Sequence, residues 1–250
     1  MNKLLFAAVS LLSAAVAATA GAGETNVAVA ANFTEPVKEI GVLFEAKTGH
    51  KAVFSFGATG QFYAQIKQDA PFAVFLAADD ATPKKAAEEG LAVADTRFTY
   101  AIGRLALWSR NPATVTGENT LKQAAFAKIA IANPAVAPYG AAAVQVMTKL
   151  GLYDALQPKI VQGATIAQAF QFAETGNAEV GFVALSQVIA KGEGSRWIVP
   201  ETLHAPIRQD AVLLNKGAGD DAAKAFLAFL KGPEAAAVIA RYGYGAAAAK

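Results

Sequence analysis

Residues 27–60 read VAVAANFTEPVKEIGVLFEAKTGHKAVFSFGATG, and this stretch decides the fold. Two short apolar runs, 27–31 and 53–56, predict strands, and an amphipathic helix lies between them. We expect Asn32 to cap the start of this helix, because an Asn side chain accepts a free N–H of the first helical turn. A second helix is predicted over residues 61–68. Two strand-to-helix turns in succession predict parallel strands.

The two turns of this stretch have the properties of an anion site. In a parallel α/β sheet they lie at the carboxyl edge, where free backbone N–H groups and the positive ends of helix dipoles converge. Neither residues 30–34 nor residues 55–60 contain Lys, Arg or His. Such turns also begin αβ units that bind nothing, so the spacing alone leaves both interpretations open.

The N-terminus has the pattern of a signal peptide, which we assign to residues 1–22. Lys3 precedes an apolar stretch from Leu4 to Ala20, and small residues suited to cleavage follow. A membrane anchor is the competing interpretation, but the run is short for a spanning helix. We therefore expect cleavage after Ala20 or Ala22 and export of the mature chain.

The composition excludes several classes of function. The chain contains no cysteine, so disulfides and Cys-based zinc, iron–sulfur and thiol chemistry are excluded. Its 22 basic and 20 acidic residues nearly balance, which gives no indication of a nucleic-acid or membrane-surface partner. His50 and His204 are too isolated to indicate a metal site or a catalytic base. Stability must come from a hydrophobic core, which a chain of this length can bury.

A buried strand over residues 72–78 is followed by an acidic pair. Asp79 and Asp80 are compatible with metal binding or acid catalysis, but an acidic pair at a strand end is more often a helix cap and a solvated turn. We expect Thr82 to cap the next helix, with Pro83 at its first position.

An extended segment over residues 98–108 predicts a strand that crosses from one domain to another, with a hinge from Tyr100 to Gly103. Beyond it, strand–turn–helix units recur, with strands predicted at 129–132, 161–162 and 180–184. A strand over 208–214 then returns to the first domain, and tail helices are predicted at about 220–231 and 233–242.

These features predict two αβ lobes. Lobe 1 is discontinuous and comprises residues 23–101 and 208–250, and lobe 2 comprises residues 102–207.

The order and spacing of these segments resemble those of the periplasmic molybdate-binding proteins of ABC importers. The resemblance covers nearly all of the mature chain and is carried by six segments: 30–33 (AANF), 55–59 (SFGAT), 70–79 (APFAVFLAAD), 181–183 (GFV), 229–233 (FLKGP) and 241–244 (RYGY). It implies the α/β, two-lobe type II periplasmic binding protein fold. Each lobe would be a mostly parallel sheet flanked by helices, with the ligand cleft between the lobes.

The resemblance also implies which residues hold the oxyanion. Asn32 matches a first-turn residue whose side chain and amide face the ligand, and Thr59 matches a hydroxyl residue of the second loop. Tyr139 matches a donor from the second lobe, and Ile166 matches a residue that contributes only its backbone N–H. Ala184 departs from the family, since some members have a Tyr there; we hypothesise that the Tyr139 hydroxyl replaces it.

The implied function is capture of molybdate, and by extension tungstate, for an inner-membrane ABC permease in the periplasm. No cofactor, no directly bound metal cation and no catalytic residue are implied, and we expect a monomer. Molybdate is a dianion that needs donors only, whereas hydrogen phosphate needs an acceptor for its proton. Sulfate carries the same charge but is smaller, so cavity size must discriminate between the two.

Three alternatives remain open. The first is a binding protein for another ligand, such as sulfate, a phosphonate or a small organic acid. The second is an enzyme on the same bilobal fold using Asp79, Asp80 or Glu174, although no Ser-His-Asp set, cleft Lys or flanking carboxylate pair is evident. The third is a sensor that has lost its transporter partners.

Overall fold

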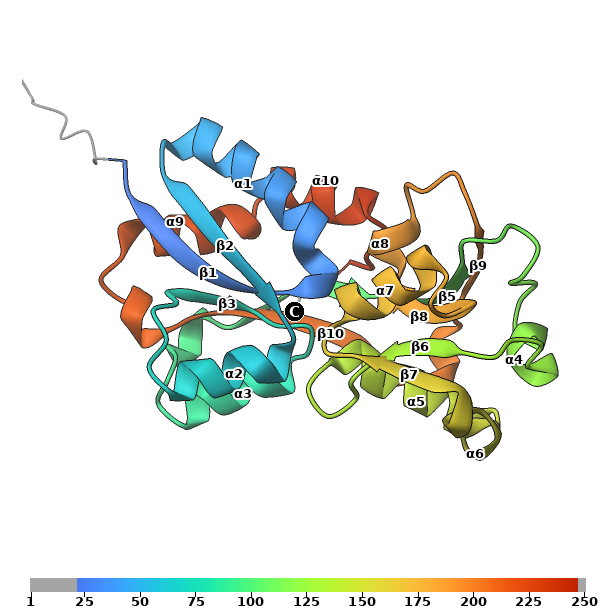
Figure 1. The fold of residues 1–250 in the computed structure, drawn as a ribbon. Coiled ribbons are helices and arrows are strands. Elements are labelled where there is room, and N and C mark those ends of the chain that lie inside the picture. Colours follow the sequence, from blue (N-terminus) through green and yellow to red (C-terminus); the bar gives the residue numbers. More distant parts are fainter. Residues whose placement is uncertain (1–21, 247–250) are drawn as a thin grey trace, which may run out of the picture.

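The computed structural model describes residues 22–246, so all of the predicted signal peptide except Ala22 lies outside the described residues. It contains two five-stranded sheets, which lie side by side with helices above and below each (Figure 1). We call each sheet with its helices a lobe. The predicted two-lobe α/β fold is confirmed.

The first lobe is built on the strand order β2-β1-β3-β10-β4. Its strands are β1 (Glu24–Ala30), β2 (Lys51–Gly57), β3 (Val74–Leu76), β4 (Phe98–Gly103) and β10 (Ile207–Leu213). Its helices are α1 (Thr34–Thr48), α2 (Thr59–Lys67), α3 (Ala81–Glu88), α9 (Asp221–Leu230) and α10 (Pro233–Arg241). β1 pairs in parallel with β2 and β3, while β10 runs antiparallel to β3 and β4.

The second lobe repeats this plan in the order β7-β6-β8-β5-β9. Its strands are β5 (Leu105–Ser109), β6 (Ile129–Ala132), β7 (Ile160–Gly163), β8 (Val180–Ala184) and β9 (Ser195–Ile198). Its helices are α4 (Asn119–Gln123), α5 (Pro138–Lys149), α6 (Tyr153–Leu156), α7 (Ile166–Thr175) and α8 (Leu185–Val188). Short 3-10 turns are η1 (Ala31–Phe33), η2 (Ala94–Thr96), η3 (Gln157–Lys159), η4 (Glu201–Leu203) and η5 (Asn215–Gly217).

Both sheets are mostly parallel, as predicted. In each, four strands run in one direction, and one strand, β10 in the first sheet and β5 in the second, is antiparallel to both of its neighbours because it enters that sheet from the other lobe. The parallel strands β1 and β2 lead into η1–α1 and α2, and β6 and β7 lead into α5 and α7. Four helix N-termini therefore lie at the carboxyl ends of parallel strands.

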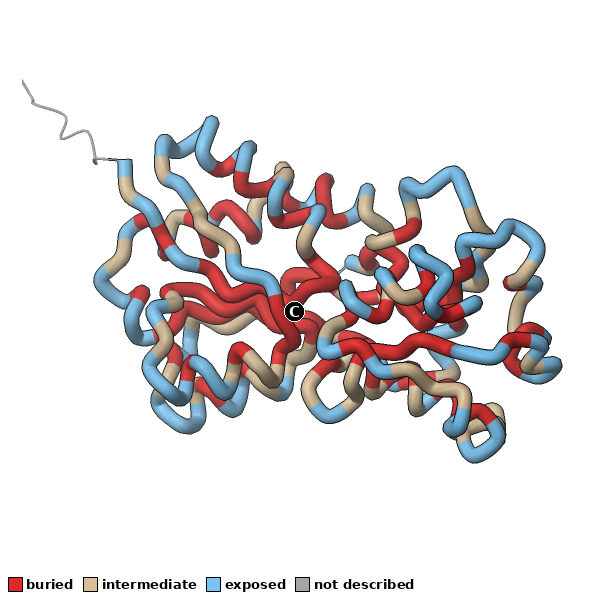
Figure 2. The backbone as a smooth tube through the Cα atoms, in the orientation of Figure 1, coloured by how far each residue is buried: buried red, intermediate tan, exposed pale blue. Residues whose placement is uncertain are grey.

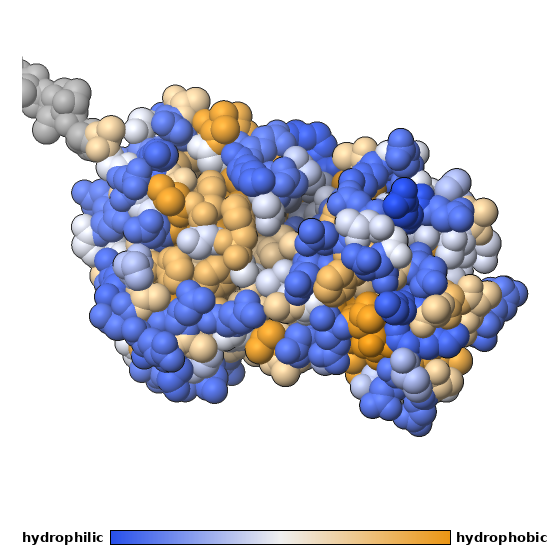
Figure 3. All heavy atoms as spheres, viewed as in Figure 1, coloured by the Kyte–Doolittle hydropathy of each residue, from blue (hydrophilic) through white to orange (hydrophobic). Residues whose placement is uncertain are grey.

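Each lobe has a core on both faces of its sheet. Val27 and Val29 of β1 belong to the cluster beneath α1, α9 and α10, whereas Ala28 packs with α2 and α3 on the opposite face. This alternation is the period of two expected of a strand covered on both sides. Figure 2 shows the central strands buried and the outer helical faces exposed. Figure 3 shows mostly polar residues on one face, with apolar atoms gathered over the region of β1 and β2.

The crossing segment differs from the prediction. Residues 98–108 were expected to form one strand, but they form β4 in the first sheet and β5 in the second, with only Arg104 between them. The predicted hinge, Tyr100 to Gly103, lies within β4, because these residues pair with β10. The predicted lobe boundaries stay a prediction.

Two predicted helix caps are wrong. Asn32 lies inside η1 and α1 begins at Thr34, because the side chain of Asn32 bonds to distant residues instead of its own turn. α3 begins at Ala81, before Thr82, and it is Asp79 that accepts the Thr82 N–H. The helix expected from residue 61 begins two residues earlier, at Thr59.

Among residues 22–246, no helix has both the length and the apolar character that crossing a bilayer requires.

Candidate functional site

A small cavity lies where the two lobes meet, and the structure brings all four predicted residues to its wall. Asn32 and Thr59 reach it from the first lobe, and Tyr139 and Ile166 from the second. The rest of the lining is small and apolar: Ala30, Ala31, Gly57, Ala58, Ala78, Ala137 and Pro138. No lining residue is an acid, an Arg, a Lys or a His, so any charge bound here would be held by neutral groups.

The wall is made largely of helix N-termini. Thr59 is the first residue of α2, Ile166 is the first of α7, and Tyr139 is the second of α5. Backbone N–H groups in a first helical turn have no partner inside their own helix. Within residues 22–246, no group accepts a hydrogen bond from the N–H of Thr59, Tyr139 or Ile166. The cavity therefore receives free donors and positive dipole ends from both lobes.

The Thr59 hydroxyl is set up to donate. Its oxygen accepts a hydrogen bond from the backbone N–H of Ala78 at 2.9 Å, and the side chain is buried. Because a hydroxyl has a single proton, accepting from Ala78 leaves that proton available for an acceptor in the cavity.

Asn32 is held differently from the prediction. Its side-chain Nδ2 donates to Gln209 Oε1 at 2.7 Å and to the Tyr244 hydroxyl oxygen at 3.0 Å, so both amide protons are committed within the protein. Among the described residues, nothing donates to its Oδ1. Its backbone oxygen accepts from Ser186 at 2.8 Å and from Tyr244 at 2.7 Å.

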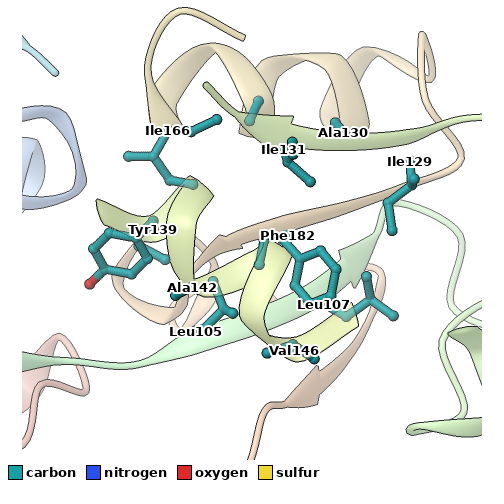
Figure 4. Close-up of a cluster of buried hydrophobic side chains, with 14 of the residues drawn as sticks. Leu105, Leu107, Ile129, Ala130, Ile131, Tyr139, Ala142, Val146, Ile166 and Phe182 are labelled. Carbon is teal, nitrogen blue, oxygen red and sulfur yellow. The ribbon is translucent and has the colours of Figure 1, made fainter. Parts of the chain in front are cut away.

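Tyr139 is buried, and its hydroxyl oxygen accepts a hydrogen bond from Gln209 Nε2 at 3.2 Å. Figure 4 shows its ring at the edge of the apolar cluster of the second lobe, with the hydroxyl directed away from Phe182 and Leu107. Burial raises the pKa of Tyr139 well above its ordinary value of 10.0, so the phenol stays protonated at neutral pH. Ala184, at the end of β8, carries no donor in its side chain.

The N-terminus of α7 is shaped by Thr165. The Thr165 side chain accepts the Gln168 N–H at 3.2 Å and caps the helix, which leaves the preceding Ile166 N–H unused. Ile166 itself is buried. The arrangement fits the predicted role of Ile166 as a donor through its backbone alone.

The lobes touch each other around the cavity. The backbone N–H of Gly60, in α2, donates to the carbonyl oxygen of Val136 in the second lobe at 2.9 Å. On another side, the Ser186 hydroxyl of α8 donates to the Asn32 carbonyl of the first lobe. Closure therefore uses direct polar contacts between the lobes.

The carboxylates considered as catalytic groups lie outside the cavity wall. Asp79 accepts hydrogen bonds from the Thr82 N–H and hydroxyl, which is the predicted cap-like role of this acidic pair, and burial raises its pKa. Asp80 lies near Arg208, and Glu174 pairs with Lys191 on the surface. Within the described part of the chain, no group of three or more potential metal-binding side chains gathers.

Three residues near the cavity were missed by the sequence reasoning. Gln209, Tyr244 and Ser186 form the buried hydrogen-bond network behind Asn32. Gln209 carries no distinguishing signal in the sequence, because it lies between Arg208 and Asp210 in β10. Tyr244 packs in the core of the first lobe, and its hydroxyl joins this network.

Comparisons with known proteins agree with this architecture. The chain matches the family of bacterial extracellular solute-binding proteins over residues 25–245. It is 59% identical to the molybdate-binding protein ModA of Rhodobacter capsulatus over 229 residues, which cover 92% of this chain and 91% of that protein. It is 57% identical to ModA of Azotobacter vinelandii over 241 residues, which cover 95% and 96%. The solved periplasmic molybdate-binding protein of Azotobacter vinelandii has a TM-score of 0.86 and 41% identity, covering 89% of this chain and 99% of that chain.

Proposed function

Because the chain belongs to the family of bacterial extracellular solute-binding proteins, we propose that it captures molybdate and delivers it to an ABC importer. The observation that carries the proposal is the cavity between the lobes, whose wall offers donors and no ionised group. Molybdate is a dianion at neutral pH and accepts hydrogen bonds on every oxygen, so such a wall matches its chemistry.

The proposed ligand contacts follow from the positions of the free donors. The backbone N–H groups of Thr59, Tyr139 and Ile166, together with that of Asn32, would bind the oxyanion from both lobes. The Thr59 hydroxyl would add a side-chain donor. We propose that the Tyr139 hydroxyl adds the other and so replaces the hydroxyl that Ala184 lacks.

The location and partners follow from the same family. We propose that the signal peptide is removed, that the mature chain works as a monomer in the periplasm, and that its partner is the inner-membrane permease of a molybdate importer. Residues 23–101 with 208–250 and residues 102–207 would then move as the two lobes. Ligand bridging them would favour the closed form that the permease recognises.

Selectivity would come from shape. Tungstate has nearly the size of molybdate, and we propose that it is bound as well. Sulfate is smaller and would leave long contacts to some donors. Hydrogen phosphate would need an acceptor for its proton, which the cavity wall does not offer as a carboxylate. We propose no catalytic activity and no cofactor.

Isothermal titration of the ligand-stripped mature protein with molybdate, tungstate, sulfate and phosphate at neutral pH tests the proposal. We expect tight one-to-one binding of molybdate and tungstate and weak or absent binding of the other two. A preference for sulfate or phosphate would reassign the ligand. Binding of none of the four, with turnover of phosphate or sulfate esters, would favour an enzyme.

Replacing Tyr139 by Phe tests its proposed role. The change removes one hydroxyl and keeps the buried ring, so we expect the fold to persist and molybdate affinity to fall about tenfold, as for one lost hydrogen bond. Titration calorimetry measures the change, and the thermal midpoint of the ligand-free protein serves as the control. An unchanged affinity would show that this hydroxyl does not reach the ligand.

A further inference from the structure

We propose that Gln209 is a positioning residue of the anion site, which joins side chains of the two lobes and sets the direction in which the Tyr139 hydroxyl donates. The inference rests on the proposed function, because it concerns how the same cavity holds its oxyanion. Gln209 lies on β10, outside the cavity wall, and so would act through Tyr139 and not by touching the ligand.

The carboxamide of Gln209 is fixed at both ends. The residue is fully buried, with 0% of its surface exposed. Its Oε1 accepts from Asn32 Nδ2 at 2.7 Å, and its Nε2 donates to the Tyr139 oxygen at 3.2 Å. The Tyr100 hydroxyl also lies 3.0 Å from Oε1. Because Asn32 donates to the oxygen, the nitrogen is left to face Tyr139; the single Tyr100 proton has the Ala77 carbonyl oxygen at 3.0 Å as a second acceptor.

This orientation determines where the phenolic proton of Tyr139 goes. A hydroxyl has one proton and accepts through its lone pairs. Because Gln209 already donates to the Tyr139 oxygen, the proton of Tyr139 must be donated elsewhere, and an oxyanion in the adjoining cavity is an acceptor. Holding the hydroxyl in this orientation before the ligand arrives reduces the ordering cost of binding.

The contact between Gln209 and Tyr139 leaves no room for a side chain at Gly103. A Cβ added at Gly103, on β4, would lie 2.3 Å from the Tyr139 oxygen and 2.7 Å from Gln209 Nε2. Neither atom could keep its position beside a larger residue. The glycine at the end of β4 thus leaves room for the contact between Gln209 and Tyr139.

Two substitutions that keep about the length of the Gln209 side chain separate its positioning role from its packing role. Gln209→Met fills the space but neither donates nor accepts. In Gln209→Glu, a protonated carboxyl can donate to Tyr139 and accept from Asn32, as the amide does. The ionised carboxylate instead accepts from both, which draws the Tyr139 proton away from the cavity and places a negative charge near the anion.

The surroundings of the introduced carboxyl make its titration interpretable. The tyrosines that face it are Tyr100, Tyr139 and Tyr244, and burial raises the pKa of each, so they stay protonated. Charged groups also lie close by: Asp79 and Asp210 raise the pKa of Tyr100, and Asp210 is paired with Arg97, while Arg208 lies near Asp80. Their effects are shared by the parent protein, which is measured over the same pH series.

The experiment is a double-mutant cycle with molybdate as the probe, measured by titration calorimetry on the mature chain. We expect Gln209→Met to weaken binding about tenfold in the parent but less than about twofold in the Tyr139→Phe background, because the hydroxyl that it positions is already absent. We expect Gln209→Glu to bind within a few fold of the parent at about pH 5.5 and about a hundredfold more weakly at about pH 8.5.

Several results would overturn the inference. They are parent-like affinity of Gln209→Met, equal losses in the two backgrounds, or a Gln209→Glu pH profile that parallels the parent. An unaffected Tyr139→Phe variant would show that this hydroxyl does not reach the ligand, which overturns the inference as well. If Gln209→Met fails to fold, Gln209→Glu and Tyr139→Phe decide the question. A parent that binds no oxyanion overturns the proposed function together with this inference, whereas a parent that binds molybdate alongside unaffected Gln209 variants overturns the inference alone.

Discussion

At the scale of single residues, the site uses hydrogen bonds behind the cavity to orient donors within it. Thr59 shows this most simply, since its oxygen is occupied by the Ala78 N–H and its proton is left for the ligand. Neutral donors carry no desolvation cost comparable to that of a buried Arg or Lys. An empty cavity of this kind can therefore stay folded without a counter-ion.

Replacing Thr59 by Val keeps the shape and removes the hydroxyl. We expect molybdate affinity to fall about tenfold or more, because a ligand contact is lost and the Ala78 N–H loses its acceptor. Thr59→Ser is the matched control and should bind within about threefold of the parent, since it keeps the hydroxyl. Titration calorimetry on the three proteins measures both effects. Equal affinity of the Val variant and the parent would remove Thr59 from the ligand contacts.

The pH dependence of binding follows from the groups that line the cavity. Tyr139 is the one ionisable side chain in the lining, and burial raises its pKa well above 10.0, so it remains a protonated donor as the pH rises. We expect the molybdate dissociation constant to vary less than about twofold between about pH 6.5 and 9. Calorimetry across this range measures it. A loss of affinity centred below about pH 9 would show that another titrating group controls binding.

At the scale of elements, each helix that meets the cavity begins directly after a parallel strand. α2 and α7 place their first residues in the wall, and the N–H groups that a helix cannot satisfy itself are the ligand donors that we propose. The start of α3, by contrast, has a side-chain cap. Asp79 accepts the Thr82 N–H at 2.7 Å, so this donor is used within the protein.

Substitution of Asp79 tests this capping role. Asp79→Ala should lower the free energy of unfolding by about 1 kcal/mol, because the cap of α3 is lost. Asp79→Asn keeps an acceptor for the Thr82 N–H and avoids burying a charge, so at pH 7 we expect it to be at least as stable as the parent. Urea unfolding measures both variants.

The pH dependence of stability in Asp79→Asn and in the parent gives a second test of this role. The pKa of Asp79 is raised by burial above its ordinary value of 3.8. Its protonated form is favoured by folding, so its stabilising contribution is complete only below pH 3.8 and is lost as the pH rises through the raised pKa. The advantage of Asp79→Asn over the parent should therefore shrink as the pH falls toward 4. An Asn variant as unstable as the Ala variant at pH 7 would contradict this account.

At the scale of the whole molecule, we propose that binding and closure are linked through contacts between the lobes. Gly60 in α2 donates its N–H to Val136 of the second lobe, and Ser186 reaches Asn32 across the same boundary. These contacts exist only where the lobes meet. A change that affects them alone should alter affinity without weakening either lobe.

Gly60→Ala tests whether affinity can be changed without weakening either lobe. A Cβ at this position would lie 3.1 Å from Val136 Cα, so it opposes closure, while Ala favours the α2 helix by up to about 1 kcal/mol relative to Gly. We expect molybdate affinity to fall several fold while the ligand-free protein becomes slightly more stable. Calorimetry and thermal unfolding measure the two quantities. Gly176→Ala, in which the added group meets only Arg110, is the control for substitution of a glycine distant from the cavity, although its φ of +80° makes it less stable. Unchanged affinity of Gly60→Ala would show that Val136 yields without cost.

Much of the fold was accessible from the sequence because it depends on local patterns. Apolar runs and helix periodicity placed β6 and β8 at their observed bounds, and the strand-to-helix turns correctly predicted parallel pairing of β1 with β2. Motif order also selected the four residues that meet at the cavity. Helix caps were less reliable, as Asn32 and Thr82 show, because a polar side chain near a helix start can bond to a distant residue instead of its own turn.

By itself, the sequence determined the αβ units, their turns and the neutral character of those turns, since all three follow from residue type and spacing. Only the tertiary structure decided which donors remain free. Asn32 was expected to offer its side-chain amide to the ligand, yet Gln209 and Tyr244, more than 170 residues away, take both of its protons. Thr59 was expected to donate, and Ala78 leaves its proton free to do so. A hydrogen-bond donor bonds to an acceptor that is close to it in space. Because this chain crosses twice between the lobes, that acceptor is set by tertiary packing and not by sequence neighbours.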